Sequence, residues 1–410
     1  MIRYRAAWVL PISSPPLRDG WIAIDGNRVT AVGRGGLDDR SAENLGSVAV
    51  LPGLVNAHTH LELSHLRDRV PPAGSFVSWA GQVVRARREH TDPAAPEILS
   101  AVRAGIVEAV RCGTALVGDI SNSLVTVEPL GRSDLSAVVF YELIRFNTHD
   151  PGALVEEAGR RVDAFPFKPS VRVDLAAHAP YSVGPGVFAH LRKAMNRRAS
   201  ARCSVHLSES AEEIEFIRQG RGPWRAFLEQ LGAWDPGWVP PGTSPVKYLD
   251  EAGFLDERVL AVHGVHANVE DLACLAARGT TLVTCPRSNS HTGAGRPPLD
   301  AFYASGVRVA VGTDSLASAP DLNVFAELAA MRRIAPAVPA PLLLESATRV
   351  GAHALGFEAD FGAIEPGRRA RLLAVQVPPS VDDVEEYLVS GIEPDQVRWL
   401  VSVEGSGSHP

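Results

Sequence analysis

The chain reads Leu51-Pro-Gly-Leu-Val-Asn-Ala-His-Thr-His60 near its start, and this stretch decides the fold that we predict. Its apolar part belongs to a run from Val48 to Ala57 with the length and composition of a buried β-strand. The stretch ends in a His-x-His pair. Because residues i and i+2 of a strand point to the same side, both imidazoles can reach one ion. The stretch therefore predicts a buried strand with a candidate metal site at its carboxyl end.

Seven more apolar runs of strand length follow this stretch, and helical patterns lie between most of them. Apolar strands that alternate with helices are typical of a parallel sheet covered on both faces, and eight repeats favour an α/β chain folded as a (β/α)8 TIM-like barrel over a doubly wound sheet. The further strands are expected at Thr114–Ile120, Ala137–Ile144, Val171–Ala177, Arg202–Leu207, Val259–His263, Thr281–Cys285 and Val307–Gly312. The clearest helices are expected at Pro96–Arg111, Ala153–Ala164, Val187–Arg198 and Val269–Arg278.

The two ends of the chain carry a second strand-like pattern. Residues 21–32 alternate about an Asp25-Gly26 turn, which indicates a β-hairpin. Residues 367–375 and 396–403 are strand-like again. We expect these end segments to pair with each other and to form a small β-sandwich domain.

This pattern predicts a division of the chain into a barrel and an accessory domain. Residues 219–246 are rich in Gly, Pro and Trp, and we expect them to form a long connection that acts as a lid. The expected division is a small β domain at 1–50 plus 360–404, a barrel at 51–359 and a flexible tail at 405–410.

Composition argues against two classes of protein. The 410-residue chain has a formal net charge of −7 and no basic run, which argues against a dedicated nucleic-acid binder. No stretch approaches the ~18 consecutive apolar residues of a membrane-spanning helix. The four cysteines are scattered without a Cys-x-x-Cys pair, which is typical of reduced thiols in a cytoplasmic protein. We therefore expect a cytoplasmic protein with no nucleic-acid or membrane partner.

Chemically active side chains follow five of the eight predicted strands. In a parallel barrel the carboxyl ends of all strands meet at one rim, where catalytic groups lie. Imidazoles and a carboxylate at this rim form a nitrogen and oxygen ligand set that suits Zn²⁺ or Fe²⁺ and leaves a position for water. The strand ends carry His58 with His60, His178, His206 with Glu209, His263, and Asp314.

Taken together, these motifs resemble the amidohydrolase superfamily, and within it the branch of cytosine, guanine and adenosine-type deaminases and the triazine hydrolases. The resemblance covers nearly the whole chain, including the small domain built from both termini. It implies a metal-dependent hydrolase with a small-molecule substrate. The metal ligands that it implies are His58, His60, His206 and Asp314. The other roles that it implies are general acid/base for Glu209, catalysis with the attacking water for His263 and Asp314, and substrate contact for His178.

Some members of this superfamily hold two metals with a bridging carboxylated lysine on the fourth strand. The predicted fourth strand, Val171–Ala177, contains no lysine, and Lys168 lies before it. We therefore predict one divalent ion per chain, with zinc as the first choice and iron(II) as the alternative. Arg371 stands where the family pattern Pro-Gly-x-x-Ala-Asp-Leu has its acid, and we expect this departure to affect a structural contact and not the chemistry.

A finer resemblance concerns the substrate. The run His60-Leu-Glu-Leu-Ser-His-Leu66 resembles the aminodeoxyfutalosine deaminases of the futalosine route to menaquinone. Those enzymes remove the 6-amino group from an adenine nucleoside that carries a 3-carboxybenzoyl tail. We expect Arg145 or Arg287 to contact the carboxylate of such a tail. The other candidate contacts are Glu62, Ser64, Asn289 and His291, and the alternative role for Glu62 and Ser64 is to fix the loop.

Other activities of the same branch would use the same metal site, and only the loops could separate them. They are deamination of 5′-deoxyadenosine, S-adenosylhomocysteine, guanine or cytosine, hydrolysis of a triazine, and opening of an imidazolone ring. A non-catalytic scaffold with the barrel fold is a remote alternative, because such a chain would have lost some of the expected ligands. Many relatives are dimers, so a homodimer is left open.

Overall fold

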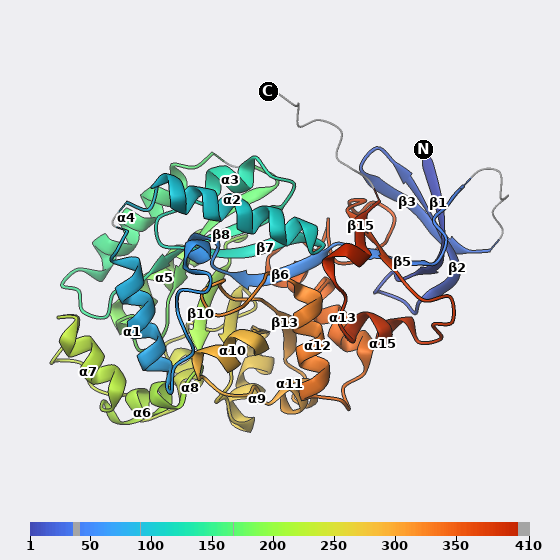
Figure 1. The fold of residues 1–410 in the computed structure, drawn as a ribbon. Coiled ribbons are helices and arrows are strands. Elements are labelled where there is room, and N and C mark those ends of the chain that lie inside the picture. Colours follow the sequence, from blue (N-terminus) through green and yellow to red (C-terminus); the bar gives the residue numbers. More distant parts are fainter. Residues whose placement is uncertain (36–41, 91, 167, 401–410) are drawn as a thin grey trace.

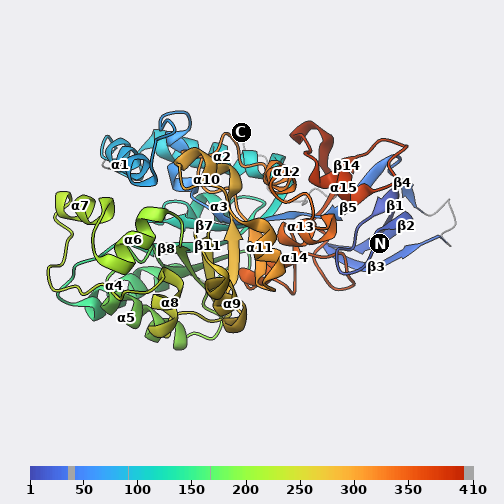
Figure 2. The same ribbon diagram turned by 90° about the horizontal axis from the view of Figure 1, so that it is seen from below.

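The computed structural model describes residues 1–35, 42–90, 92–166 and 168–400. Figure 1 shows a large part, in which helices surround a group of strands, and a small sheet beside it. In the view from below, α1 (Phe76–Arg87) and α7 (Pro223–Gln230) lie at the end away from the small sheet (Figure 2). The tail expected at 405–410 lies outside the described residues, as do residues 401–404.

Eight parallel strands form the centre of the large part. They hydrogen-bond as two four-stranded sheets, in the orders β6-β7-β8-β9 and β10-β11-β12-β13. At one seam the N–H of His206 donates to the carbonyl oxygen of His178 at 2.8 Å. At the other seam the N–H of Asp314 donates to the carbonyl oxygen of His58 at 3.0 Å, so the strands form a ring and the predicted (β/α)8 fold is confirmed. The strands are β6 (Leu54–Thr59), β7 (Thr114–Ser121), β8 (Ser136–Leu143), β9 (Val171–Ala177), β10 (Cys203–Leu207), β11 (Val259–His263), β12 (Thr281–Thr284) and β13 (Arg308–Val311).

Helices connect these strands and cover the outside of the ring (Figure 1). Two of the four predicted helices have the predicted bounds, α2 (Pro96–Arg111) and α9 (Val269–Arg278). The other two, α4 (Pro151–Asp163) and α5 (Pro185–Asn196), begin two residues earlier than predicted, because proline is favoured at the first helical position. No helix in the described ranges is long and apolar enough to cross a membrane.

The remaining helices of the described ranges are shorter, and most of them lie between or after the ring strands. They are α3 (Val127–Gly131), α6 (Ala211–Gln219), α8 (Pro245–Glu251), α10 (Pro286–Thr292), α11 (Leu299–Ala304), α12 (Val324–Ile334), α13 (Ala340–Ser346), α14 (Arg349–Ala354) and α15 (Val384–Val389). Two 3₁₀ helices are η2 (Leu61–Leu66), directly after β6, and η3 (Pro394–Gln396).

The single strand expected at residues 48–57 is two strands in different sheets, so this prediction is corrected. β5 (Val48–Pro52) belongs to the small sheet, and β6 belongs to the ring. Gly53 separates them, and a Cβ atom at this position would lie 2.6 Å from the Cβ of Ala115. Glycine therefore lets the chain pass close to the neighbouring strand as it leaves one sheet for the other.

Both ends of the chain build the small sheet. Its strands hydrogen-bond in the order β15-β14-β5-β1-β2-β3, with β4 paired to β1. The predicted hairpin is the antiparallel pair β2 and β3, and β14 from the C-terminal part pairs with β5. The strands not yet located are β1 (Ile2–Val9), β2 (Leu17–Asp25), β3 (Arg28–Arg34), β4 (Glu43–Asn44), β14 (Leu372–Gln376) and β15 (Val397–Trp399).

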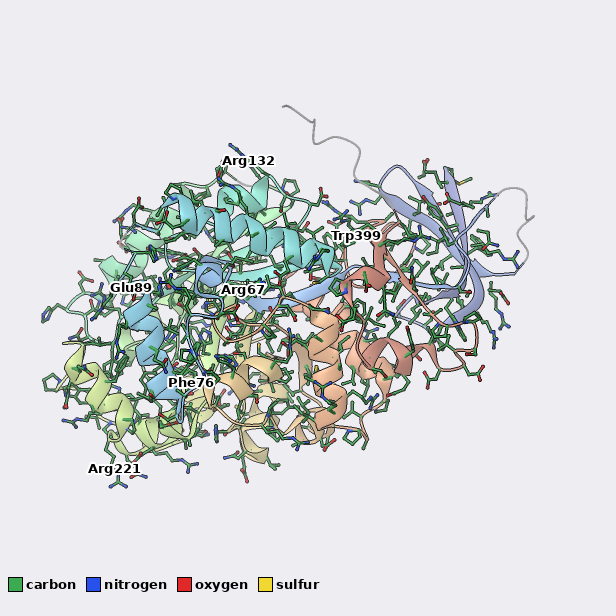
Figure 3. All side chains as sticks on the ribbon, in the orientation of Figure 1. Arg67, Phe76, Glu89, Arg132, Arg221 and Trp399 are labelled. Carbon is green, nitrogen blue, oxygen red and sulfur yellow. The ribbon has the colours of Figure 1, made fainter. Side chains whose placement is uncertain are left out.

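Trp399 joins the small sheet to the ring, and Figure 3 shows it at the junction of the two parts. Its indole N–H donates to the carbonyl oxygen of Val110, at the end of α2, at 3.0 Å. The guanidinium of Arg371 lies 3.9 Å from the centroid of the Trp399 ring, a cation–π contact. The departure from the family pattern at Arg371 therefore makes a structural contact within the small sheet, and the same guanidinium lies 3.9 Å from the carboxylate of Asp134 in the large part.

Residues 219–246 contain α7 and the start of α8, which corrects the long connection expected there. Pro223 occupies the first position of α7, where its fixed φ favours a helix. Trp234 and Trp238 pack on Phe146, with ring centroids 5.8 and 5.4 Å away. Proline and tryptophan thus mark a helix and an aromatic cluster in this segment.

Candidate functional site

A cavity of about 330 Å³ lies at the carboxyl ends of the ring strands. Its floor consists of imidazoles and carboxylates from the strand ends. Its wall consists mostly of apolar and aromatic side chains from α1, α7 and the loops that follow the strands. The floor residues that line the cavity are His60, Glu142, His178, His206, Glu209, His263 and Asp314. The main wall residues are Phe76, Trp79, Val83, Phe146, Tyr181, Trp224, Phe227 and Leu231.

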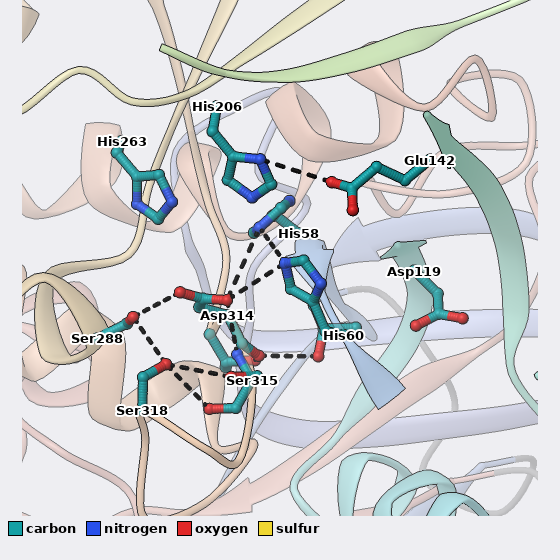
Figure 4. Close-up of polar contacts among 12 residues, drawn as sticks. His58, His60, Asp119, Glu142, His206, His263, Ser288, Asp314, Ser315 and Ser318 are labelled. Atoms are coloured by element: carbon teal, nitrogen blue, oxygen red, sulfur yellow. Dashed lines mark hydrogen bonds and ion pairs between the residues drawn. The ribbon is translucent and has the colours of Figure 1, made fainter. Parts of the chain in front are cut away.

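Three ligand atoms converge at the floor with spacings that suit a metal ion. The Nε2 atoms of His58 and His60 lie 3.2 Å apart. The Oδ1 atom of Asp314 lies 3.4 Å from Nε2 of His60 and 3.9 Å from Nε2 of His58 (Figure 4). Two ligands of a tetrahedral zinc ion, each about 2.0–2.1 Å from the metal, are about 3.4 Å apart. The donor atoms of these three residues therefore fit one divalent ion.

His206 brings a further imidazole to the same point. Its ring centroid lies 5.0 Å from that of His58, and ligand atoms of His58, His206 and His263 all lie within 4.8 Å of one another. Nδ1 of His206 lies 2.9 Å from the backbone carbonyl oxygen of His178, which can only accept a hydrogen bond. Nδ1 therefore carries the proton, and Nε2 keeps its lone pair for a metal.

Burial keeps the imidazoles of the floor neutral. It lowers the pKa of His60 to about 3 and the pKa values of His178 and His263 to about 4. It also lowers the pKa values of His58 and His206. Neutral imidazole is the form that binds metal ions. These side chains therefore need not lose a proton before they bind a metal ion at neutral pH.

Neighbouring donors hold the carboxylate of Asp314 in place. The hydroxyl of Ser288 donates to Oδ2 at 2.5 Å, and the N–H of Ser315 donates to Oδ1 at 2.8 Å. Burial raises the pKa of Asp314, but His60, His263 and the Ser288 hydroxyl outweigh burial and bring this pKa below its ordinary value. The ionised carboxylate is therefore favoured, and this form can bind a cation or take a proton.

Glu209 and His263 form a pair beside these ligand atoms. Oε1 of Glu209 lies 3.3 Å from Nε2 of His263, and Nδ1 of His263 lies 2.8 Å from Oδ1 of Asn289. Because the Asn289 oxygen accepts from Nδ1, the Nε2 atom of His263 is an acceptor facing Glu209. Burial, and then the charges of Asp314 and Glu213, raise the pKa of Glu209 well above its ordinary value. Glu209 is therefore suited to donate a proton inside the cavity.

The backbone turns sharply where three strands meet the cavity. Ser208, His263 and Asp314 have φ values of 52°, 78° and 58°, in the left-handed region that residues other than glycine rarely adopt. Glu213 holds one of these turns, because its carboxylate accepts the N–H groups of Ser208 and Glu209 at 3.0 and 2.8 Å. Such strain persists where the surrounding fold fixes it, and it is concentrated at functional sites.

Most of the residues predicted from the sequence meet at this cavity. Arg145 lies at its mouth with an exposed side chain, and it is part of the wall. Asn289 lies behind His263 and does not line the cavity. The predicted residues that gather at the floor are His58, His60, His178, His206, Glu209, His263 and Asp314.

Glu62 and Ser64, predicted as substrate contacts, do not line the cavity. Oε2 of Glu62 accepts hydrogen bonds from Ser121, Asn122 and Ser123, two of them from backbone N–H groups. Ser64 faces α2, where a Cβ atom at Gly105 would lie 2.8 Å from the Ser64 hydroxyl oxygen. The hydrogen bonds of Glu62 and the packing of Ser64 against α2 fit the alternative role, which is to fix the loop.

Arg287 and His291, also predicted as substrate contacts, are likewise absent from the cavity lining. The guanidinium of Arg287 is paired with Asp321 at 2.9 Å and with the buried Glu327 at 2.6 Å. Nε2 of His291 lies 3.0 Å from the carbonyl oxygen of Val70. Both side chains are therefore already engaged within the fold.

Four polar residues around the floor were missed by sequence reasoning. Glu142 is the acid near the end of the run Ala137–Ile144, so the same attention to strand ends would have found it. Asn122, Glu213 and Ser288 act on other site residues, and nothing in the local pattern marks them. The aromatic wall was also missed, because its residues come from segments far apart in the sequence.

Comparison with known proteins agrees with this geometry. The profile of the amidohydrolase family matches residues 49–398. An aminodeoxyfutalosine deaminase from Deinococcus radiodurans is 31% identical over 362 residues, which cover 83% of this chain and 82% of that protein. A 5-methylthioadenosine/S-adenosylhomocysteine deaminase from Halobacterium salinarum is 31% identical over 371 residues, which cover 87% of this chain and 80% of that protein.

Two solved structures share the fold. An adenosine deaminase from Xanthomonas campestris with bound zinc superposes with a TM-score of 0.82 and 26% identity, over 97% of this chain and 90% of that one. An aminofutalosine deaminase from Helicobacter pylori, in complex with methylthio-coformycin, superposes with a TM-score of 0.83 and 25% identity, over 95% of each chain.

Proposed function

The chain belongs to the amidohydrolase family and is a hydrolytic deaminase, and we propose that its substrate is aminodeoxyfutalosine, an adenine nucleoside that loses its 6-amino group as ammonia. The product would then enter menaquinone synthesis by the futalosine route. The observation that carries the deamination is the floor of the cavity, where a ligand set for one divalent ion lies beside a glutamic acid and an imidazole. The choice of substrate is supported by the aromatic wall with Arg145 at its mouth.

We infer that one ion is bound per chain, with zinc as the first choice and iron(II) as the alternative. Zinc in the solved relative from Xanthomonas campestris supports this choice. The spacing of the ligand atoms and the neutral state of the imidazoles also support it. The proposed ligands are His58, His60, His206 and Asp314.

When bound, such an ion lowers the pKa of water toward neutrality and supplies the nucleophile. The residues of the floor then move the protons. Asp314, which is ionised and lies beside the proposed metal position, takes the proton of the attacking water. Glu209, whose pKa is raised by burial, donates a proton to the ring nitrogen beside the carbon that carries the amine, which makes this carbon electrophilic.

The imidazoles of the floor orient these groups. Nε2 of His263 accepts a hydrogen bond from Glu209 or from the attacking water and so fixes their positions. His178 lines the cavity, and its Nδ1 lies 2.6 Å from the hydroxyl of Ser182. The other ring nitrogen of His178 is left for the substrate, which supports the proposed substrate contact.

The wall supports an adenine nucleoside with a large apolar 5′ substituent. Tyr181 stacks on Trp224 with ring centroids 3.8 Å apart, and Phe76 and Phe227 extend this aromatic surface along the cavity. Arg145, exposed at the mouth, has no side-chain partner among the described residues. An aryl ring against the aromatic surface would bring its carboxylate toward such a cation.

A second candidate is deamination of 5′-methylthioadenosine or S-adenosylhomocysteine. The relative from Halobacterium salinarum is as similar to this chain as the aminodeoxyfutalosine deaminase is. An apolar wall also suits a methylthio group, and the amino acid carboxylate of S-adenosylhomocysteine could use the same arginine. The floor would be identical in either case, so only the wall separates the two candidates.

An ultraviolet assay of the purified, zinc-loaded protein tests the proposal directly. It compares aminodeoxyfutalosine with 5′-methylthioadenosine, S-adenosylhomocysteine, 5′-deoxyadenosine, adenosine, guanine and cytosine, and ammonia release confirms each positive result. We expect the highest kcat/KM for aminodeoxyfutalosine. A higher kcat/KM for either sulfur-containing nucleoside would replace the proposed substrate with the second candidate, and turnover of guanine or cytosine alone would reject an adenine nucleoside.

Three further expectations are kept as proposals. The chain divides into a small β domain at 1–50 plus 360–404 and a barrel at 51–359, the protein is cytoplasmic, and a homodimer is left open. Limited proteolysis, cell fractionation and sedimentation test these expectations in turn.

A further inference from the structure

Glu142, at the end of β8, is a carboxylate of the floor that the proposed reaction does not use. Its side chain is only 3% exposed. Its Oε1 atom lies 3.7 Å from Nδ1 of His206, as Figure 4 shows, and its Oε2 atom accepts a hydrogen bond from Nδ2 of Asn122 at 2.9 Å. Burial raises the pKa of Glu142, and His206 and the hydrogen bond from Asn122 oppose this rise and favour the charged form.

Asn122 holds Glu142 in a fixed orientation. Nη1 of Arg87 donates to Oδ1 of Asn122 at 2.8 Å, so the amide nitrogen of Asn122 points to Glu142 and not away from it. The backbone N–H of Asn122 donates to Oε2 of Glu62 at 3.0 Å, and Arg87 pairs with the same glutamate at 3.3 Å. Backbone and side chain of Asn122 are thus both fixed.

The cluster of Glu142, His178 and His206 has the spacing of a metal site, because one ligand atom of each lies within 4.8 Å of the others. The hydrogen bonds argue against a second ion. Nδ1 of His206 donates to the carbonyl oxygen of His178, so Glu142 faces an N–H group and not a lone pair. Nδ1 of His178 is engaged with Ser182. Glu142 therefore faces the Nδ1 side of the proposed ligand His206 and would not itself bind the metal ion.

We propose that Glu142 and Asn122 are positioning residues for His206: the Glu142 carboxylate, oriented by Asn122, faces the Nδ1–H group and directs Nε2 to the metal. The inference rests on the metal site of the proposed function. The carbonyl oxygen of His178 fixes the tautomer of His206, and the charge of a carboxylate 3.7 Å behind the same Nδ1–H group orients the ring and makes the metal-facing nitrogen a stronger ligand. This series of contacts begins at Arg87 in α1, the same helix from which Phe76 and Trp79 form part of the wall.

The test measures zinc affinity of the full-length protein by competition with a chelator, which needs no substrate. Glu142→Gln keeps the size of the side chain and removes the charge, and we expect it to weaken zinc binding about 10- to 100-fold, the usual loss for such a residue. Asn122→Ala should act in the same direction with a smaller effect. Glu142→Asp, which restores the charge at a shorter reach, should recover part of the loss.

Asp174→Asn is the matched control. It makes the same chemical change in a buried carboxylate on the neighbouring strand β9, where Asp174 accepts the N–H of Arg202 outside the cavity. We expect its zinc affinity to equal that of the wild type. This control separates a specific effect on His206 from the general effect of removing a buried charge.

Two results would overturn the inference. One is a wild-type zinc affinity in Glu142→Gln, or in Asn122→Ala if the first variant does not fold. The other is a raised KM with unchanged zinc affinity, which would make Glu142 a substrate contact. A wild-type protein that binds zinc tightly but deaminates none of the nucleosides would reject the proposed substrate and leave this inference standing.

Discussion

The floor and the wall of the cavity differ in origin and in chemistry. The floor comes from strand ends, its side chains are buried, and hydrogen bonds fix most of them. The wall comes from α1, α7 and loops, and it combines aromatic packing with exposed side chains such as Ile144 and Arg145. Two relatives with different substrates are equally similar to this chain. We therefore expect the floor to set the reaction and the wall to select the substrate.

Removal of the metal should have the largest effect on the reaction, because it disables the floor and leaves the wall intact. Prolonged dialysis against a strong chelator is expected to lower kcat by about 10³-fold or more, since a bound ion contributes several kcal/mol to such hydrolysis. Zinc should restore the wild type. His58→Ala should not be restored at ordinary zinc concentrations, and a fully active His58→Ala protein would refute the ligand set.

Glu209→Gln should impair the reaction at the floor without loss of the bound metal. The amide cannot donate the proton that we assign to the buried carboxyl, so kcat is expected to fall about 10²- to 10⁴-fold. Zinc content, measured by atomic emission, should stay at the wild-type level. Glu212→Gln makes the same change three residues away in α6 and should leave kcat unchanged. Near-normal turnover in Glu209→Gln would remove Glu209 from the reaction.

Arg145→Ala tests the contribution of the wall to substrate binding. We expect KM for aminodeoxyfutalosine to rise about tenfold, the size of one charge-assisted hydrogen bond at an exposed position. KM for 5′-methylthioadenosine, which has no carboxylate, is the internal control and should change little. The value of kcat should be preserved for both substrates. Equal increases of KM for the two nucleosides would show that Arg145 does not recognise an anion.

Asp174 tests whether a buried carboxyl outside the cavity matters for stability alone. Burial raises its pKa to about 7. Below about pH 4 the carboxyl is protonated in both the folded and the unfolded chain, and between about pH 4 and pH 7 only the unfolded chain releases the proton. The contribution of Asp174 to the free energy of unfolding should therefore fall as pH rises through this window.

Urea unfolding of the wild type and of Asp174→Asn across this pH range measures that contribution. The difference in unfolding free energy between the two proteins should shift in favour of the variant as pH rises, while kcat stays the same. The exposed Asp300→Asn change is the control and should give no pH-dependent difference. A constant difference between wild type and Asp174→Asn would mean that Asp174 titrates normally.

The elements that the sequence predicted best are those with a local signal. Strands such as Val171–Ala177 and Val259–His263 have the predicted bounds, because a short run in which apolar residues predominate marks a strand in a parallel barrel. The break at Gly53 could not be predicted. It depends on the approach of Ala115, which lies far along the chain.

The residues of the candidate site also fall into two groups, those with a local signal in the sequence and those whose contacts depend on distant segments. Residues at strand ends were found, because the topology of a parallel barrel sends every strand end to one rim, whatever the distances in sequence. Glu62, Arg287 and His291 also lie near strand ends, but the fold engages each of them in hydrogen bonds or ion pairs, and Ser64 packs against α2. A sequence pattern shows that a side chain is near the rim, but it does not show which other residue of the fold contacts that side chain.

The resemblance of the motifs to the amidohydrolase family indicated the reaction class, while the amino-acid sequence alone predicted the eight-strand ring and the set of donor atoms at its rim. These depend on apolar periodicity and on which residue types close each strand, and both are local properties of the chain. The hydrogen bond that sets the tautomer of His206, the contacts of Glu142 and the composition of the aromatic wall became visible in the tertiary structure alone. These depend on distances of a few ångströms between segments that are far apart in sequence, and such distances are set by packing of the whole fold.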